Sequence, residues 1–160
     1  MNVEAKLQAL GLALPAPVKV PPGVNVPFCW VRAYGDRVHV SGHGPLAADG
    51  SVVGPFGRVG ADVSAEQAFE AARSATLAVL ASLKRELGDL DRVCAWLTIS
   101  GMVNVAPGFV QTTNVINACS ELILELYGPD VGRHARTAIG MAQLPLNLPV
   151  VIAAEVAIRP

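Results

Sequence analysis

The chain has 160 residues, of which 52% are hydrophobic and 16% charged, and its formal net charge is −1. This length fits one domain, and the balanced charge, with no basic cluster beyond Lys84-Arg85, excludes an electrostatic surface for nucleic acid. No membrane span or signal peptide is recognisable, so we expect a cytoplasmic protein, and its apolar content predicts surface buried between copies of the chain.

The N-terminal part predicts one short helix followed by irregular chain. Asn2 is a suitable cap for a helix over residues 3–10, and Gly11 can end it. Prolines then exclude regular structure, at positions 15, 17, 21, 22 and 27. We therefore interpret residues 1–27 as a peripheral extension and residues 28–160 as the single domain.

Two strands and a long loop are expected next. Residues 28–34 and 37–42 flank the turn pair Gly35-Asp36 and predict a hairpin, with Val38 and Val40 on one face and His39, Ser41 and His43 on the other. Residues 42–60 are rich in glycine and are expected to form a loop.

The middle of the chain predicts two helices separated by a strand. Ser64 and Gln67 match a capping box, and Gly88 can end the helix that they begin. Residues 92–103 are apolar on both faces, which is typical of an interior strand. A second helix is expected to start at Pro107 and to close at Gly128-Pro129.

The last two strands are predicted to pair as a hairpin over residues 135–144 and 150–158, around Asn147. In that register Arg136 and Glu155 would share one side, surrounded by small residues. A guanidinium there needs a carboxylate partner or an anionic ligand. Alternatively, Arg136 reaches solvent at a strand end.

The resulting order is β-β-α-β-α-β-β, an α+β sandwich with both helices on one face of the sheet. The other face is apolar, and closing several sheets into a barrel would bury it. Cys29, Cys94 and Cys119 are widely spaced and favour thiols in a reducing compartment. His39, His43 and His134 lack metal-ligand spacing, so we expect no metal.

This order, together with four segments, resembles the RidA/YjgF family of enamine/imine deaminases, also known as L-PSP endoribonuclease-like. The segments are VHVSGHGPL at 38–46, ELGDLDRV at 86–93, VIN at 115–117 and HARTAIGMAQLPL at 134–146. The resemblance implies a chorismate-mutase-like fold and a homotrimer whose sheets line a central barrel with the helices outside. It also implies ligand clefts between subunits and no cofactor.

The resemblance further implies that Arg136 clamps the substrate carboxylate and is the catalytic residue to test. Substrate-binding positions carried over with it are Ser41, Gly42, Phe28, Asn117, His43 and Ala138. The backbone N–H groups of Ser41-Gly42 are expected to face the carboxylate, with the glycine allowing its close approach. Phe28 stands where many members have Tyr, and Ala138 replaces a common Cys. Asn117 has a second interpretation as a solvated helix amide, and His43 as a surface histidine or an alternative base.

One difference from the family sequence leaves more than one functional hypothesis open. Deaminating members carry Glu-Ile-Glu where this chain has Val151-Ile152-Ala153, and the first of those glutamates is thought to position the attacking water. The first hypothesis is a hydrolase for reactive 2-imino and 2-enamino acids. The second is a non-catalytic trimeric binding protein for small carboxylates. For Glu155 we expect a role as ion-pair partner of Arg136 or as a carboxylate lining the barrel, in preference to that of catalytic base. Ribonuclease activity is a remote third option, because the charge offers no phosphate-tracking groove.

Overall fold

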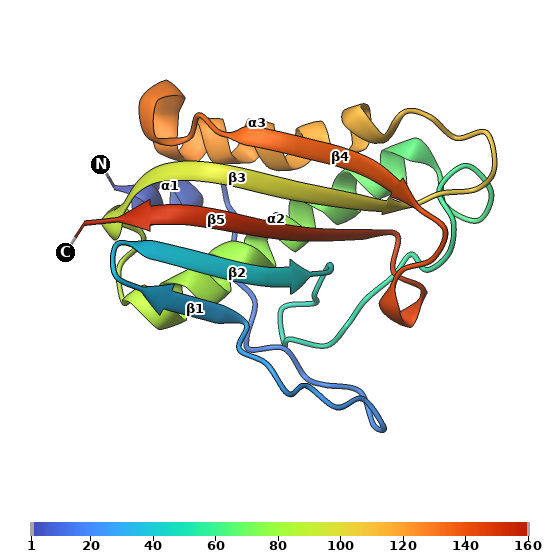
Figure 1. Ribbon diagram of the computed structural model, residues 1–160, viewed down its shortest axis with the longest axis horizontal. Coiled ribbons are helices and arrows are strands. Elements are labelled where there is room, and N and C mark those ends of the chain that lie inside the picture. The colour runs from blue at the N-terminus through green and yellow to red at the C-terminus, as the bar shows by residue number, and fades with distance from the viewer. Residues whose placement is uncertain (1, 160) are drawn as a thin grey trace.

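The protein folds as one five-stranded sheet with its two long helices packed on the same face (Figure 1). The computed structural model describes residues 2–159. Its helices are α1 (Val3–Ala9), α2 (Ala65–Leu87) and α3 (Thr112–Val131), with short 3₁₀ turns η1 (Leu90–Arg92) and η2 (Pro145–Asn147). Its strands are β1 (Val31–Tyr34), β2 (Arg37–His43), β3 (Val93–Asn104), β4 (Ala135–Met141) and β5 (Val150–Ile158). The predicted α+β sandwich and element order are confirmed.

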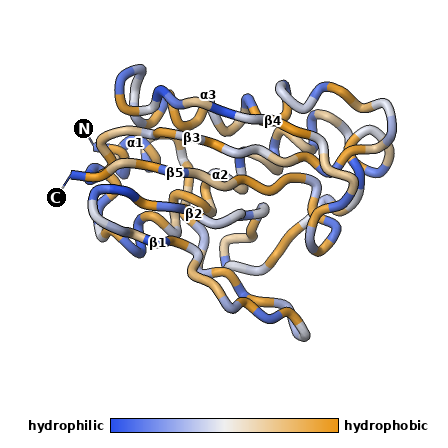
Figure 2. Tube along the Cα trace, viewed as in Figure 1, coloured by the Kyte–Doolittle hydropathy of each residue, from blue (hydrophilic) through white to orange (hydrophobic). Residues whose placement is uncertain are grey.

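The strands lie in the order β1-β2-β5-β3-β4, so the chain's last strand fills the centre of the sheet. Strand β5 is antiparallel to both β2 and β3, whereas β4 is parallel to β3. Figure 2 shows hydrophobic residues along nearly all of β5, which suits a strand with neighbours on both sides. Strand β4, with mostly exposed or half-buried residues, suits the edge.

The prediction that β4 and β5 form a hairpin is therefore wrong. The eight residues between them carry the chain past the end of β3, so that β5 enters the gap between β2 and β3. Arg136, Ile99 and Ala154 lie side by side across β4, β3 and β5 and form one row of the sheet. Thr98 and Glu155 lie side by side in the next row. Because neighbouring rows point to opposite faces, Arg136 and Glu155 do not share a side.

The first hairpin is confirmed, with one correction at its end. Val38 and Val40 are buried, as predicted. The pairing of β2 with β5 shifts between Val40 and His43, which marks a bulge at this point. A bulge changes which face the following residue occupies. His43 therefore points to the helix side and is buried, instead of facing the same way as His39.

The helix ends follow their local signals. Ser64 and Gln67 form the predicted capping box, and Gly88 ends α2 in a left-handed conformation with φ of 77°. Helix α3 begins at Thr112, later than the predicted start at Pro107, because residues 107–110 form a loop. The backbone of Gly128 leaves helical geometry, so the predicted closure at Gly128-Pro129 is confirmed as a break within the last turns.

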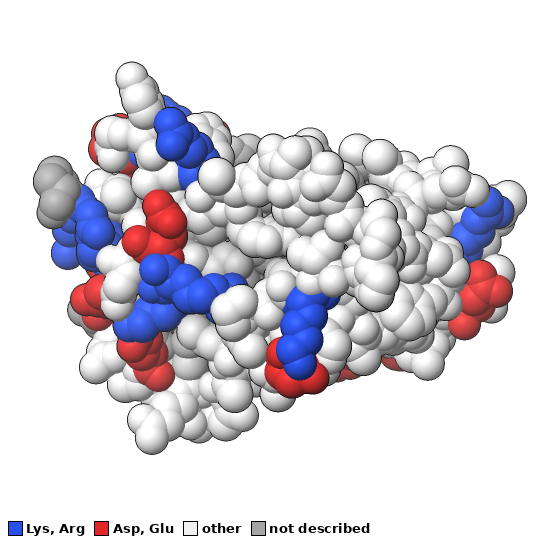
Figure 3. Space-filling model, turned by 90° about the horizontal axis from the view of Figure 1, so that it is seen from below, with Lys and Arg blue, Asp and Glu red and all other residues white. Residues whose placement is uncertain are grey.

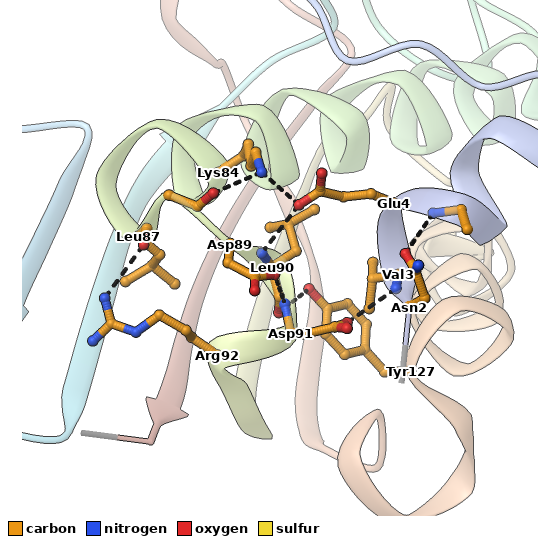
Figure 4. Close-up of polar contacts among 12 residues, drawn as sticks. Asn2, Val3, Glu4, Lys84, Leu87, Asp89, Leu90, Asp91, Arg92 and Tyr127 are labelled. Carbon is orange, nitrogen blue, oxygen red and sulfur yellow. Dashed lines mark hydrogen bonds and ion pairs between the residues drawn. The ribbon is translucent and has the colours of Figure 1, made fainter.

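Helix α1 is held against the end of α2 and the turn η1 (Figure 4). The Val3 N–H donates to the Asp91 carboxylate at 3.0 Å, and Glu4 pairs with Lys84 at 2.6 Å. Val3 and Leu7 are buried in the main core. The division of the chain at residue 27 stays a prediction, and its outer limits, Met1 and Pro160, lie outside the described residues.

The sheet face opposite the helices is uncovered in the single chain. Half-buried or exposed hydrophobic side chains point to it from the inner and edge strands, and include Met102, Ile139 and Val151. No helix among residues 2–159 has the length and apolarity needed to cross a membrane.

Gly101 sets how closely α3 packs on the sheet. A Cβ atom at this position would lie 2.5 Å from Cγ1 of Ile116 on α3, so any side chain would push the helix away. We expect Gly101→Ala to lower the free energy of unfolding by about 1–3 kcal/mol, the usual cost of overpacking. Chemical denaturation measures this, with Ser100→Ala on the opposite face as control; equal stability of the two variants would contradict the packing argument.

Candidate functional site

Arg136 lies near the start of β4 and reaches across to α3, where neutral groups hold it. Its Nη1 donates to Asn117 Oδ1 at 2.9 Å and to Ser120 Oγ at 3.1 Å, and its Nη2 to the Thr113 carbonyl at 3.5 Å. Within residues 2–159 no carboxylate lies within ion-pairing distance of this guanidinium. Its positive charge is therefore not neutralised by any side chain of the described part of the chain.

The expected pairing of Arg136 with Glu155 is wrong. Glu155 instead accepts from Arg37 Nη1 at 2.6 Å on the uncovered sheet face. Three of the five N–H groups of Arg136 are engaged, which leaves two for a ligand, one on Nη2 and one on Nε. Adjacent N–H groups of a guanidinium can grip a carboxylate with two parallel hydrogen bonds.

Ser120 and His134 extend this arrangement and were missed from the sequence. Because Ser120 Oγ accepts from Arg136, its hydroxyl hydrogen is available to His134 Nε2 at 2.8 Å, and His134 Nδ1 then donates to the Gly132 carbonyl at 2.7 Å. Two spacings could have indicated the cluster: Asn117 and Ser120 are three apart on one helix, and His134, just before β4, is two residues from Arg136.

Two other predicted site residues, Asn117 and Ala138, lie at the same edge of the sheet as Arg136. Asn117 contacts the guanidinium directly, which favours a site role over a solvated amide. Ala138 is two residues beyond Arg136 on the same face of β4, and its carbonyl accepts from Thr112 Oγ1 at 2.9 Å. We call Arg136, Asn117, Ser120 and Ala138 the arginine half-site.

A cavity of about 420 Å³ forms at the other edge of the sheet, and three predicted site residues line it: Phe28, Gly42 and His43. The irregular chain before β1 forms one wall, and residues near η2 and Val151 form another. A Cβ on Gly42 would come within 2.7 Å of Val151 Cγ1, so this glycine contacts the position of the family's glutamate. We call Phe28, Gly42, His43 and Val151 the cavity half-site.

Aromatic rings form part of the cavity wall. Phe28 packs edge-on against Trp30 with ring centroids 5.1 Å apart, and Trp30 lies 5.1 Å from His43. Seen from the side of β1, the molecule carries its charged side chains mainly toward one end, and most of the remaining surface is uncharged (Figure 3). The lining of the cavity is correspondingly almost entirely apolar.

Ser41 is more fully occupied than the sequence suggested. Its N–H donates to the Trp30 carbonyl at 2.9 Å, and its hydroxyl donates to the Cys29 carbonyl at 2.7 Å. The expectation that both backbone N–H groups of Ser41-Gly42 face a carboxylate is corrected, because that of Ser41 is already used. Ser41 instead fixes the segment that leads into β1, and only the Gly42 N–H remains a candidate.

His43 is a buried, hydrogen-bonded residue. Its Nδ1 lies 2.6 Å from the Ser41 carbonyl and its Nε2 lies 2.8 Å from Ser82 Oγ on α2, which also accepts from Arg85. Burial lowers the pKa of His43, and the nearby charge of Arg85 lowers it further. Since both ring nitrogens are engaged, this geometry argues against His43 as the base that activates water.

The lowered pKa of His43 predicts a pH-dependent stability. In the unfolded chain the imidazole binds a proton more readily than in the fold, so the free energy of unfolding should fall as pH drops below about 6.5. The slope from this one group is at most about 1.4 kcal/mol per pH unit. Urea unfolding of the parent and His43→Gln between pH 7 and pH 5 measures the difference; parallel curves would contradict it.

The two half-sites do not meet within one chain. The arginine half-site is on β4 and α3, the cavity half-site is at the end of β2, and strands β5 and β3 separate them. Three strand spacings correspond to roughly 14 Å across the sheet. The arginine also points to the helix face, whereas Val151 lies on the uncovered face. A small acid cannot touch both within one molecule.

Metal coordination has no support in the described residues. Across residues 2–159, no three His, Cys, Asp or Glu side chains gather in a way that could hold an ion. His134 and His43 are engaged with serines and carbonyls at different edges of the sheet.

Comparison with known proteins identifies the family of the chain. The sequence profile described as "YjgF/chorismate mutase-like, putative endoribonuclease" matches residues 4–156. Protein TCP17 of Trypanosoma cruzi is 38% identical over 155 residues, which cover 97% of this chain and 93% of that protein.

Solved structures agree with the profile. Protein Atu1372 of Agrobacterium tumefaciens, whose function is unknown, is 35% identical with a TM-score of 0.87, covering 98% of this chain and 92% of that one. RidA from an Antarctic Psychrobacter is 16% identical with a TM-score of 0.56, covering 91% and 96%, and so shares the fold. The chain is a member of the RidA/YjgF family and has its chorismate-mutase-like fold.

Proposed function

We propose that the protein binds small 2-oxo, 2-imino and 2-enamino acids and hydrolyses the imines slowly, in sites made by two copies of the chain. The observation that carries this proposal is the guanidinium of Arg136, which is oriented by Asn117 and Ser120, has no carboxylate partner among residues 2–159, and keeps two N–H groups free. A side chain held in this way is suited to grip a carboxylate ligand.

The position of the half-sites supports assembly into a homotrimer. Each is incomplete, since one has the cation without an apolar pocket and the other has a pocket without a cation. A head-to-tail interface around a closed ring joins the β4 edge of one copy to the β2 end of the next. The uncovered, largely apolar sheet face would then line the barrel inside the ring.

The reaction is hydrolysis of a carbon–nitrogen double bond. Water adds to the imine carbon of R–C(=NH)–COO⁻, and loss of ammonia leaves the 2-oxo acid R–CO–COO⁻. Arg136 holds the carboxylate and so orients the imine carbon. At the position where a glutamate of deaminating relatives is thought to direct the water, this chain has Val151. Among residues 2–159, His43 is the one titratable side chain that lines the cavity.

A second candidate is a binding protein without catalysis. The apolar Val151 favours it, because a general base must lie within hydrogen-bond reach of the attacking water. Both candidates use the same carboxylate clamp, and they differ only in turnover.

One pair of measurements tests the proposal. Isothermal titration with 2-oxobutanoate should give saturable binding, with at most one molecule per chain. An assay that generates 2-iminopropionate in situ should then give a small acceleration for the hydrolase or none for the binding protein. Absence of binding to both 2-oxobutanoate and pyruvate at millimolar concentration would refute the carboxylate site.

A further inference from the structure

We propose that the preferred ligand carries a bulky apolar side chain, aryl or at least four carbons long, which occupies the cavity at the end of β2. This inference rests on the proposed function, because it assigns the other end of the same ligand. The volume of about 420 Å³ is within the range of pockets that enclose small organic molecules. An acid as small as pyruvate would leave most of it empty.

The chemistry of the lining indicates an apolar occupant. Aliphatic side chains from the irregular segment before β1, such as Val20 and Val24, face aliphatic side chains from the loop after β2 and from η2. The aromatic rings of Phe28 and Trp30 also line the cavity. The single buried titratable group, His43, has both ring nitrogens engaged and offers no charge to a ligand.

The direction of the ligand follows from Gly42. This residue belongs to the cavity lining and to the Ser41-Gly42 pair that the resemblance places beside the substrate carboxylate. A carboxylate at Gly42, gripped by Arg136 of a neighbouring copy, leaves the side chain of the acid pointing into the cavity. Val151 borders that path and presents two methyl groups to the ligand in place of a glutamate's charge.

Trp30 gives a direct readout because it lines the cavity, whereas the other tryptophan, Trp96, is 2% exposed in the core. Tryptophan fluorescence titrations with pyruvate, 2-oxobutanoate, 2-oxohexanoate, 2-oxooctanoate and phenylpyruvate should show affinity rising about fourfold for each buried methylene. The total gain from pyruvate to 2-oxooctanoate should exceed about 50-fold, allowing for incomplete burial.

Matched variants distinguish the contribution of the cavity to affinity from the contribution of Arg136. Val24→Phe fills the cavity from a side chain that is 40% exposed, and Val52→Phe fills it from the opposite wall, so two independent variants guard against misfolding. Both should flatten the dependence on chain length and leave pyruvate affinity within about threefold. The control Val110→Phe, at an 83% exposed position outside the cavity, should retain the full dependence.

The outcomes distinguish failure of this inference from failure of the proposed function. Pyruvate binding that depends on Arg136, with no gain for longer acids, would overturn the inference and leave the function standing. Quenching of Trp30 by 1-hexanol, without any binding of the acids, would support an apolar cavity and refute the carboxylate site. Binding of neither the acids nor 1-hexanol would overturn both.

Discussion

Arg136→Ala should abolish measurable binding of 2-oxobutanoate while leaving the fold and the assembly unchanged. The guanidinium is the only cation of the arginine half-site, and hydrogen bonds to a charged group are individually strong. We expect a loss of about 2–4 kcal/mol, or roughly 30- to 1000-fold in dissociation constant. Isothermal titration measures it, and circular dichroism with analytical ultracentrifugation verifies fold and assembly.

Two variants sharpen this test. Arg133→Ala removes an exposed arginine three residues earlier and should bind as the parent does. Arg136→Lys keeps the charge without the two-pronged geometry, so its affinity should lie between the parent and Arg136→Ala. Equal affinity of Arg136→Ala and Arg133→Ala for 2-oxobutanoate, in a protein of unchanged assembly, would show that Arg136 does not bind the ligand carboxylate.

Val151→Glu should increase the rate of imine hydrolysis. A carboxylate here would stand beside Gly42 at the mouth of the cavity half-site, within reach of water at the substrate carbon. General base catalysis contributes about 10²–10⁴ in rate when fully placed, and we expect at least about tenfold from this single change. Ammonia release from 2-iminopropionate generated in situ gives the measurement.

The control is Val151→Gln, which has nearly the same shape and cannot act as a base. A gain in Val151→Glu alone identifies the lost base as the reason for slow turnover. Equal rates in the parent, Val151→Glu and Val151→Gln, with ligand binding preserved in all three, would show that this position does not control water activation.

Much of the fold could be predicted because its signals are local. The capping box at Ser64 and Gln67, the left-handed stop at Gly88 and the turn at Gly35 each act over a few residues, and the structure has all of them. The predicted pairing of β4 with β5 was wrong because a short connection and alternating residues indicate that two strands exist, but do not determine which strands lie beside them.

The candidate site was partly predictable for the same reason. Arg136, Asn117 and Gly42 could be named from their motifs, whereas the partners Ser120 and His134 depend on how α3 lies against β4. The bulge between Val40 and His43 turned His43 into the core, which simple alternation along a strand cannot anticipate. The separation of the site into two halves required the strand order.

The most direct test of the central claim mixes two defective variants. Arg136→Ala lacks the clamp, and Gly42→Leu blocks the cavity half-site, so each alone should not bind 2-oxobutanoate. If the site lies between copies of a closed ring, random co-assembly restores about one quarter of the sites, since each interface needs one specific pairing. Titration of co-refolded oligomers, with mixed composition verified by native mass spectrometry, should recover that fraction. No recovery in verified mixed oligomers would contradict a site shared between neighbouring chains.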